Sequence, residues 1–123
     1  MTSDADAWAT VAVRVRVPGL TAEEISRQVG LEVERSPRDP GVWVYDVPVG
    51  QERPLNEHLD GLEVLLAERG EQLGGLPEGR EVDVVIGWSP KRGQDGMTLT
   101  PELVARLARL GAGVVTWTYT DHS

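Results

Sequence analysis

The second half of the chain alternates helix and strand patterns in a regular order, which constrains the fold more than any other feature. An amphipathic segment at residues 55–73 is followed by a strand-like run at 81–88, a helix at 100–110 and a β-rich stretch at 113–119. Strands that alternate with helices predict a sheet covered by helices. No catalytic or ligand-binding motif lies over this order. The sequence thus predicts an α/β domain more clearly than it predicts a function.

The first half predicts a strand, a short helix and a hairpin. Residues 9–17 alternate along the strand, with Arg14 and Arg16 on one side and a row of alanine and valine residues on the other. Short strands at 31–35 and 42–47 are predicted to pair as a hairpin, because the residues between them are rich in turn formers.

Two helices carry clear end signals. Thr21 is the predicted N-cap of the first helix, Glu24 completes a capping box, and Gly30 ends the helix. Thr100 caps the last helix, Pro101 takes its first position and a glycine at 111 ends it. These signals place both helices to within a residue or two.

The middle helix has an apolar stripe and an acidic face. At about 100° per residue the leucines fall on one side, which predicts that they dock the helix on the sheet. The leucines are Leu55, Leu59, Leu62, Leu66 and Leu73, and the acidic residues opposite them are Glu57, Asp60, Glu68 and Glu71. The acidic face is therefore expected to look at solvent or at a partner.

The complete order, β-α-β-β-α-β-α-β, predicts an α+β domain built as a single α/β sandwich. Its first six elements match a ferredoxin-like β-α-β-β-α-β core, which a C-terminal α-β unit extends. We expect a mostly antiparallel sheet with the helices on one face. Residues 1–123 form one predicted domain, with frayed ends at 1–7 and 120–123 and a mobile loop at 89–98.

The residues that begin and end these elements resemble a bacterial family known as domain of unknown function 4279. The resemblance covers segments 24–26, 29–31, 58–66, 96–103 and 107–112, together with Trp43 and a terminal strand that ends at Tyr119. The family usually has a proline soon after its Gly-Leu pair, whereas here Glu32 follows that pair and Pro37 comes later. The family has no established activity, so the resemblance implies a fold and no catalytic residue.

Composition limits the partners and the location. The chain has 123 residues with a net charge of −8, which disfavours nucleic acid, and its nine acidic and three basic residues between Glu52 and Asp83 account for −6 of that charge. Cysteine is absent, so no disulfide or thiolate metal site is expected. The N-terminus is acidic and no apolar run is long enough to cross a bilayer. We therefore expect a cytoplasmic protein with no membrane partner.

Few residues in the sequence could act in catalysis. His58 lies between Glu57 and Asp60 in the sequence and could act as a general base, but a half-buried histidine on a helix flank is the favoured interpretation. His122 falls in the predicted frayed tail. A zinc site would need both histidines and carboxylates from separate elements, so no metal, cofactor or catalytic residue is predicted.

Other polar residues also fit surface roles better than chemistry. The serines at 26, 36 and 89 lie in no nucleophile elbow. Lys91 and Arg92 sit in a glycine-flanked loop that lacks the ending of a phosphate-binding loop, so a solvated turn is favoured over an anion site.

Two functional hypotheses remain. The first is a small acidic non-enzymatic binding module, for example an immunity-type or regulatory protein, that binds a basic protein through Glu57, Asp60, Glu68 and Glu71. The alternative is a small-molecule-binding or accessory protein of a biosynthetic pathway that uses the open sheet face. Its candidate ligand-binding residues are Arg14, Arg16, Trp43, Tyr45 and Trp88, although core packing is the favoured role of the aromatic side chains.

Overall fold

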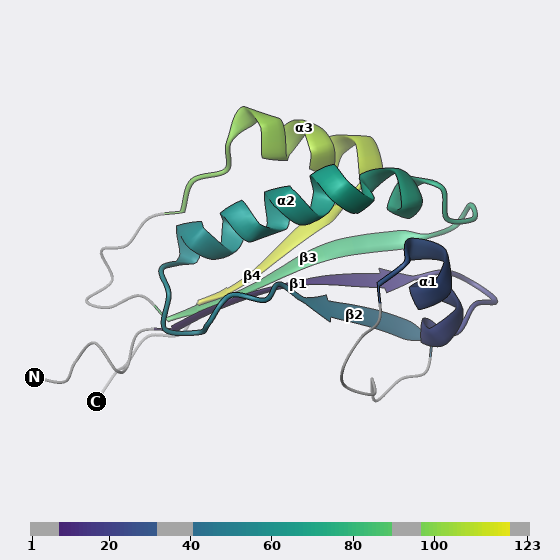
Figure 1. Ribbon diagram of the computed structural model, residues 1–123, viewed down its shortest axis with the longest axis horizontal. Coiled ribbons are helices and arrows are strands. Elements are labelled where there is room, and N and C mark those ends of the chain that lie inside the picture. Colours follow the sequence, from purple (N-terminus) through teal and green to yellow (C-terminus); the bar gives the residue numbers. More distant parts are fainter. Residues whose placement is uncertain (1–7, 32–40, 90–96, 119–123) are drawn as a thin grey trace, which may run out of the picture.

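The computed structural model describes residues 8–31, 41–89 and 97–118, which form a four-stranded sheet and three helices (Figure 1). The strands are β1 (Trp8–Arg16), β2 (Val42–Asp46), β3 (Glu81–Ser89) and β4 (Gly113–Thr118). The helices are α1 (Ala22–Val29), α2 (Leu55–Gly74) and α3 (Pro101–Leu110). The expectation of an α+β chain is confirmed.

The sheet is mixed, with the strand order β2-β1-β3-β4 among the described residues. β1 pairs antiparallel with β2 on one side and antiparallel with β3 on the other, with Val13 opposite Tyr45 and also opposite Val84. β4 pairs parallel with β3. The chain passes through α3 between these two strands, as a parallel pair requires. The C-terminal α-β unit therefore extends the sheet, as expected.

All three helices cover one face of the sheet. The predicted alternation of β1 is confirmed, because Val11, Val13 and Val15 are buried whereas Arg14 and Arg16 are exposed on the opposite face. The helices supply the other half of the same hydrophobic cluster, which includes Ile25 and Val29 of α1, Leu59, Leu62 and Leu66 of α2, and Leu103 and Leu107 of α3. The second face of the sheet carries no described helix (Figure 1).

The capping signals produce the predicted helix ends. The backbone N–H of Glu24 donates to Thr21 Oγ1, and the backbone N–H of Thr21 donates to a carboxylate oxygen of Glu24, so the capping box is complete. These hydrogen bonds from Thr21 also hold the pKa of Glu24 below its usual value. Gly30 and Gly111 end α1 and α3 in the left-handed conformation, which glycine adopts without steric cost.

The ferredoxin-like core is not confirmed in full, because the described strand order β2-β1-β3-β4 is not that of a complete unit. The sheet is mixed, and the expected mostly antiparallel pairing holds for two of its three described strand pairs. Most of the strand expected at 31–35 lies outside the described residues, as do most of the loop at 89–98 and both predicted frayed ends.

Among the described residues, no helix is long and apolar enough to cross a membrane.

Candidate functional site

The acidic face of α2 is exposed as predicted. The five predicted leucines are buried, and so is Leu65 beside them. On the opposite side Asp60, Glu68 and Glu71 are exposed, and Val64 lies among them with 56% of its surface exposed. We call Glu57, Asp60, Val64, Glu68 and Glu71 the acidic stripe. Its spacing places these side chains on one line along the helix.

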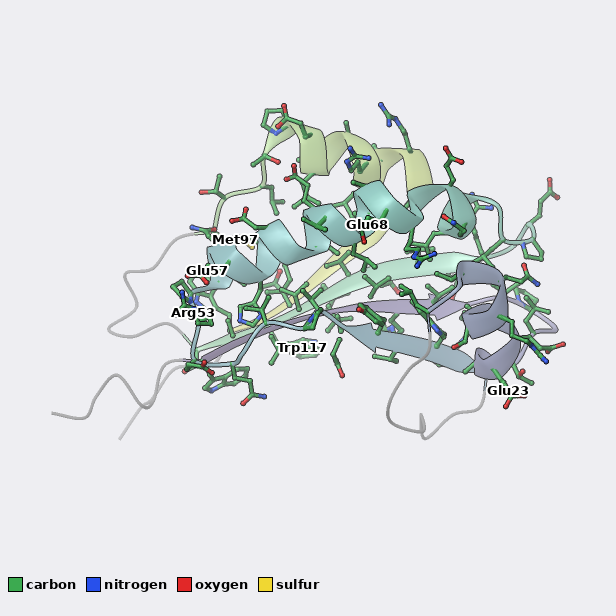
Figure 2. The ribbon with its side chains drawn as sticks, in the orientation of Figure 1. Glu23, Arg53, Glu57, Glu68, Met97 and Trp117 are labelled. Carbon is green, nitrogen blue, oxygen red and sulfur yellow. The ribbon has the colours of Figure 1, made fainter. Side chains whose placement is uncertain are left out.

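The carboxylates of the acidic stripe differ in how well they are compensated. Glu57, at the start of α2, accepts two hydrogen bonds of 2.8 Å from the guanidinium of Arg53, so its charge is largely neutralised (Figure 2). Among the described residues, Asp60, Glu68 and Glu71 form no salt bridge. The negative charge without an ion-pair partner therefore lies along the middle and the C-terminal half of α2, where Glu71 borders the arginines of α3.

Glu63 lies on a different flank of α2 and has a structural role. Its carboxylate accepts a 2.8 Å hydrogen bond from the hydroxyl of Thr100, the N-cap of α3. The side-chain oxygen of Asn56, two turns earlier in α2 on that flank, accepts from the backbone N–H of Thr98. These contacts fix the start of α3 against a flank of α2 that does not include the acidic stripe.

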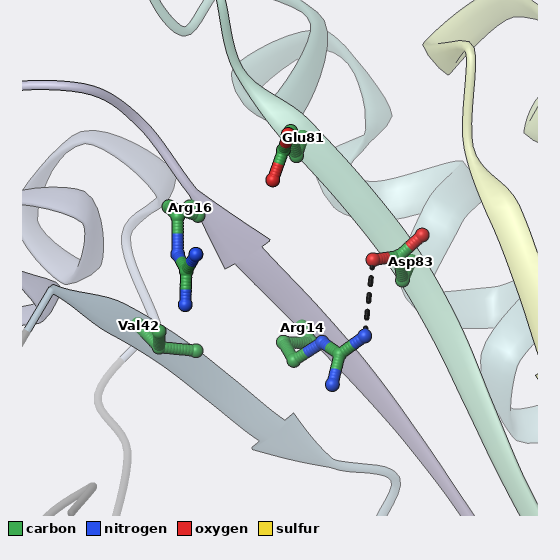
Figure 3. Close-up of a pocket in the computed structure, with 5 residues that line it drawn as sticks. All are labelled: Arg14, Arg16, Val42, Glu81 and Asp83. Atoms are coloured by element: carbon green, nitrogen blue, oxygen red, sulfur yellow. Dashed lines mark hydrogen bonds and ion pairs between the residues drawn. The ribbon is translucent and has the colours of Figure 1, made fainter. Parts of the chain in front are cut away.

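A shallow hollow of about 190 Å³ lies on the open face of the sheet, opposite the helices (Figure 3). It is lined by Arg14 and Arg16 of β1, Val42 of β2, and Glu81 and Asp83 of β3. The strand register explains this gathering, because Arg14 is opposite Asp83 and Arg16 is opposite Glu81. Arg14 donates to Asp83 at 3.2 Å, and about half of the arginine side chain is exposed.

The structure separates the five residues of the small-molecule hypothesis. Arg14 and Arg16 are on the open face, whereas Trp43, Tyr45 and Trp88 are on the face covered by helices. The Trp43 side chain is fully buried, its indole N–H donates to the hydroxyl of Ser26 at 2.9 Å, and its ring stacks on Tyr45 at a centroid distance of 5.9 Å. The favoured core role of these aromatic side chains agrees with this geometry.

His58 is more deeply buried than the sequence indicated. The predicted half-buried position is wrong, because only 1% of the residue is exposed. Neither ring nitrogen makes a hydrogen bond of good geometry to a described residue. Burial lowers the pKa of His58, and the backbone carbonyls of Gly50 and Arg53 and the carboxylates of Glu57 and Glu52 partly oppose this effect. The enclosed ring is a core residue, whereas Asp60 is exposed and Glu57 is paired with Arg53.

A second hollow, of about 250 Å³, lies between α2 and α3. Leu66, Ala67, Gly70 and Glu71 line it from α2, and Arg106, Arg109 and Leu110 line it from α3. The Nε atom of Arg106 is buried without a hydrogen-bond partner among the described residues. Glu71 thus lies at the border between the acidic stripe and this basic groove.

The described residues contain no group of three or more histidine, aspartate or glutamate side chains placed to hold a metal ion. His122, Ser36, Lys91 and Arg92 lie outside the described residues. No family model, curated protein or solved structure matches this chain. The site is therefore judged on its own geometry.

Sequence reasoning missed the acidic half of the open-face hollow and the groove between α2 and α3. Glu81 and Asp83 are charged residues of the predicted strand at 81–88, whose alternation places them on the side opposite its apolar residues. Their approach to Arg14 and Arg16 depends on β1 and β3 being neighbours in register. No local pattern encodes that pairing.

Proposed function

We propose that this protein is a non-enzymatic binding module that recognises a basic surface of another protein through the acidic stripe of α2. The observation that carries the proposal is the exposure of Val64 between Asp60 and Glu68, each one turn away, with Glu71 one turn further along the acidic stripe. A single apolar side chain surrounded by uncompensated carboxylates offers a desolvated contact within a region of negative potential.

Electrostatics supports a basic partner. With a net charge of −8 the chain attracts cationic surfaces over roughly one Debye length, about 8 Å at physiological ionic strength. Charged side chains at the solvent-exposed rim of an interface act mainly on the rate at which the two proteins associate. An immunity-type protein, which neutralises a basic toxin by covering it in the cytoplasm, is a concrete form of this proposal.

Membership of the domain of unknown function 4279 family and a complete ferredoxin-like core are parts of the same proposal. Support for the core comes from the central position of β1, which pairs antiparallel with both β2 and β3. Support for the family comes from the capping box at Thr21 and the start of α3 at Thr100-Pro101, which lie in the segments that carry the resemblance.

Capture from the source lysate at low ionic strength tests the proposal with two variants of equal charge. The first, D60N/E68Q/E71Q, neutralises the acidic stripe and leaves Glu57 paired with Arg53. The control, E23Q/E78Q/E102Q, removes three exposed carboxylates elsewhere.

We expect a basic protein to be retained by the wild type and by the control variant, and to be lost with the stripe variant. Equal retention by the two variants would show that net charge alone, and not the stripe, holds the protein. If the wild type retains no protein specifically, the proposal is wrong. Circular dichroism of both variants checks that the fold is intact.

The hollow on the open face supports a second candidate, a small anionic ligand bound by Arg14 and Arg16. Its volume of about 190 Å³ is below the usual range for drug-sized ligands, so the ligand would be a small anion. Inorganic phosphate and citrate are suitable probes in a thermal-shift titration. A saturable rise in Tm that Arg16→Gln abolishes and Arg27→Gln preserves would favour this candidate, because Arg27 is exposed on α1 away from the hollow.

A further inference from the structure

β4 forms one edge of the described sheet, and its own residues carry none of the charges or prolines that protect natural edge strands. Its six residues, Gly113–Thr118, have the sequence GVVTWT, which contains no charged residue and no proline. Its described strand neighbour is β3 alone. Edge strands that stay unpaired usually carry lysine, proline or a bulge, because a bare edge presents a row of free backbone donors and acceptors. β4 is therefore built to pair with another strand.

Apolar side chains gather around the same edge. The described part of the chain exposes five large apolar residues, and three of them lie here: Val104 of α3 at 48%, Val114 at 42% and Trp117 at 57%. Val114 is on the helix side of β4, whereas Trp117 follows the register to the open side (Figure 2). Exposed apolar side chains on both faces of an edge strand are typical of an interaction surface.

The outer flank of α3 continues this surface without charge. Arg106 and Arg109 line the groove between α2 and α3. The other flank of α3, which follows the helical spacing i, i+4 and i+7, consists of Val104, Ala108 and the C-cap Gly111. α1 contacts α2, and α2 contacts α3, so the helices lie side by side on the sheet (Figure 1). Because α1 contacts β2 and α2 contacts β1, this order puts α3 on the side of α2 toward β3 and β4 in the strand order β2-β1-β3-β4.

A second copy of this chain fits this surface. Two copies of charge −8 repel each other, and this repulsion is weakest where the contacting residues carry no charge. The flank of Val104, Ala108 and Gly111 and the whole of β4 meet that condition. The Asp83 carboxylate lies beside Gly113 and is paired with Arg14.

We propose that the protein forms a two-fold symmetric dimer in which β4 pairs antiparallel with β4 of a second copy, centred on Val115. In this register Trp117 of each copy lies opposite Gly113 of the other, and Val114 lies opposite Thr116. Residues directly opposite each other in an antiparallel pair point to the same face, so the Trp117 ring of each copy lies beside Gly113 of the other copy. There it lies next to the Asp83 carboxylate, whose Oδ1 is 2.8 Å from a Cβ built at Gly113. The interface is isologous and closes after two copies. It leaves both acidic stripes exposed and does not depend on the proposed function.

Analytical ultracentrifugation of the full chain tests the dimer with two single variants, in which the same change from valine to glutamate is made at different sites. Val114→Glu puts a charge on the edge, and Val64→Glu puts the same charge on an equally accessible valine of α2. We expect the wild type and Val64→Glu to sediment at twice the 13.4 kDa chain mass, and Val114→Glu to sediment as a monomer with unchanged circular dichroism. A monomeric wild type at every concentration, or a dimer that Val114→Glu leaves intact, overturns the proposal.

Cysteine cross-linking tests the register independently of these variants. The chain has no cysteine, so Val115→Cys introduces a single thiol. The symmetry axis brings the two copies of residue 115 directly opposite each other, with Cβ atoms about 4.5–5.5 Å apart, which is close to the separation of about 3.5–4.5 Å that a disulfide needs. We expect mild oxidation to link Val115→Cys into dimers at least tenfold faster than Val64→Cys. Equal rates for the two variants overturn the proposal.

Discussion

Replacing Ser26 by alanine tests the hydrogen bond that joins α1 to β2. The indole N–H of Trp43 donates to the Ser26 hydroxyl at 2.9 Å, and the Trp43 side chain is fully buried. In Ser26→Ala this donor loses its partner in an enclosed site. Leaving a buried donor unsatisfied costs about 1–3 kcal/mol, which outweighs the gain of roughly 0.5 kcal/mol from the better helix propensity of alanine.

A double-mutant cycle isolates this contact from the general effects of each substitution. In the Trp43→Phe background no indole N–H is present, so Ser26→Ala should be neutral or slightly stabilising. The expected coupling free energy is therefore about 1–3 kcal/mol. Urea unfolding followed by far-ultraviolet circular dichroism gives the four free energies of unfolding, provided that the m-value stays constant. Effects that add within about 0.3 kcal/mol would refute the contact.

Three further perturbations test the helix orientation and the buried histidine. Leu62→Ala should lower the free energy of unfolding by about 2–5 kcal/mol because it opens a cavity under α2, whereas Glu68→Ala should change it by less than about 0.5 kcal/mol; equal effects in chemical denaturation would mean that the helix is rotated. The pKa of His58 is lowered in the folded state, so the unfolded chain binds the proton more tightly, and stability that is present above about pH 6.5 is lost as the pH falls. The stability of the wild type should fall relative to His58→Leu below that pH by up to about 1.4 kcal/mol per pH unit, and parallel pH profiles would contradict the assignment.

Local chemistry explains why much of the fold could be predicted. The ends of α1 and α3 depend on Thr21, Thr100 and their terminal glycines, and each of these acts on backbone groups within a few residues. The orientation of α2 follows from a leucine stripe that is regular over the whole helix. Short-range signals of this kind are fully contained in the sequence, so the predicted acidic face is found on the exposed side.

Long-range pairing explains what could not be predicted. The periodicity of α2 placed His58 beside the leucines, but it could not show that the chain around Gly50 and Arg53 folds back over the ring. Alternation showed that Trp43 and Tyr45 share a side of their strand, without showing that this side faces the helices. The open-face hollow needs Arg14 and Asp83 on adjacent strands, and that adjacency arises only from the strand order.

The association rate of the basic protein captured by the wild type is the most direct test of the acidic stripe. Stopped-flow mixing across a range of ionic strengths gives this rate for the wild type, for D60N/E68Q/E71Q and for the control E23Q/E78Q/E102Q. Removing charges that steer the encounter should slow association at low salt and flatten its salt dependence, by more for the stripe variant than for the control of equal net charge. The same rate and the same salt dependence for both variants would contradict recognition through α2.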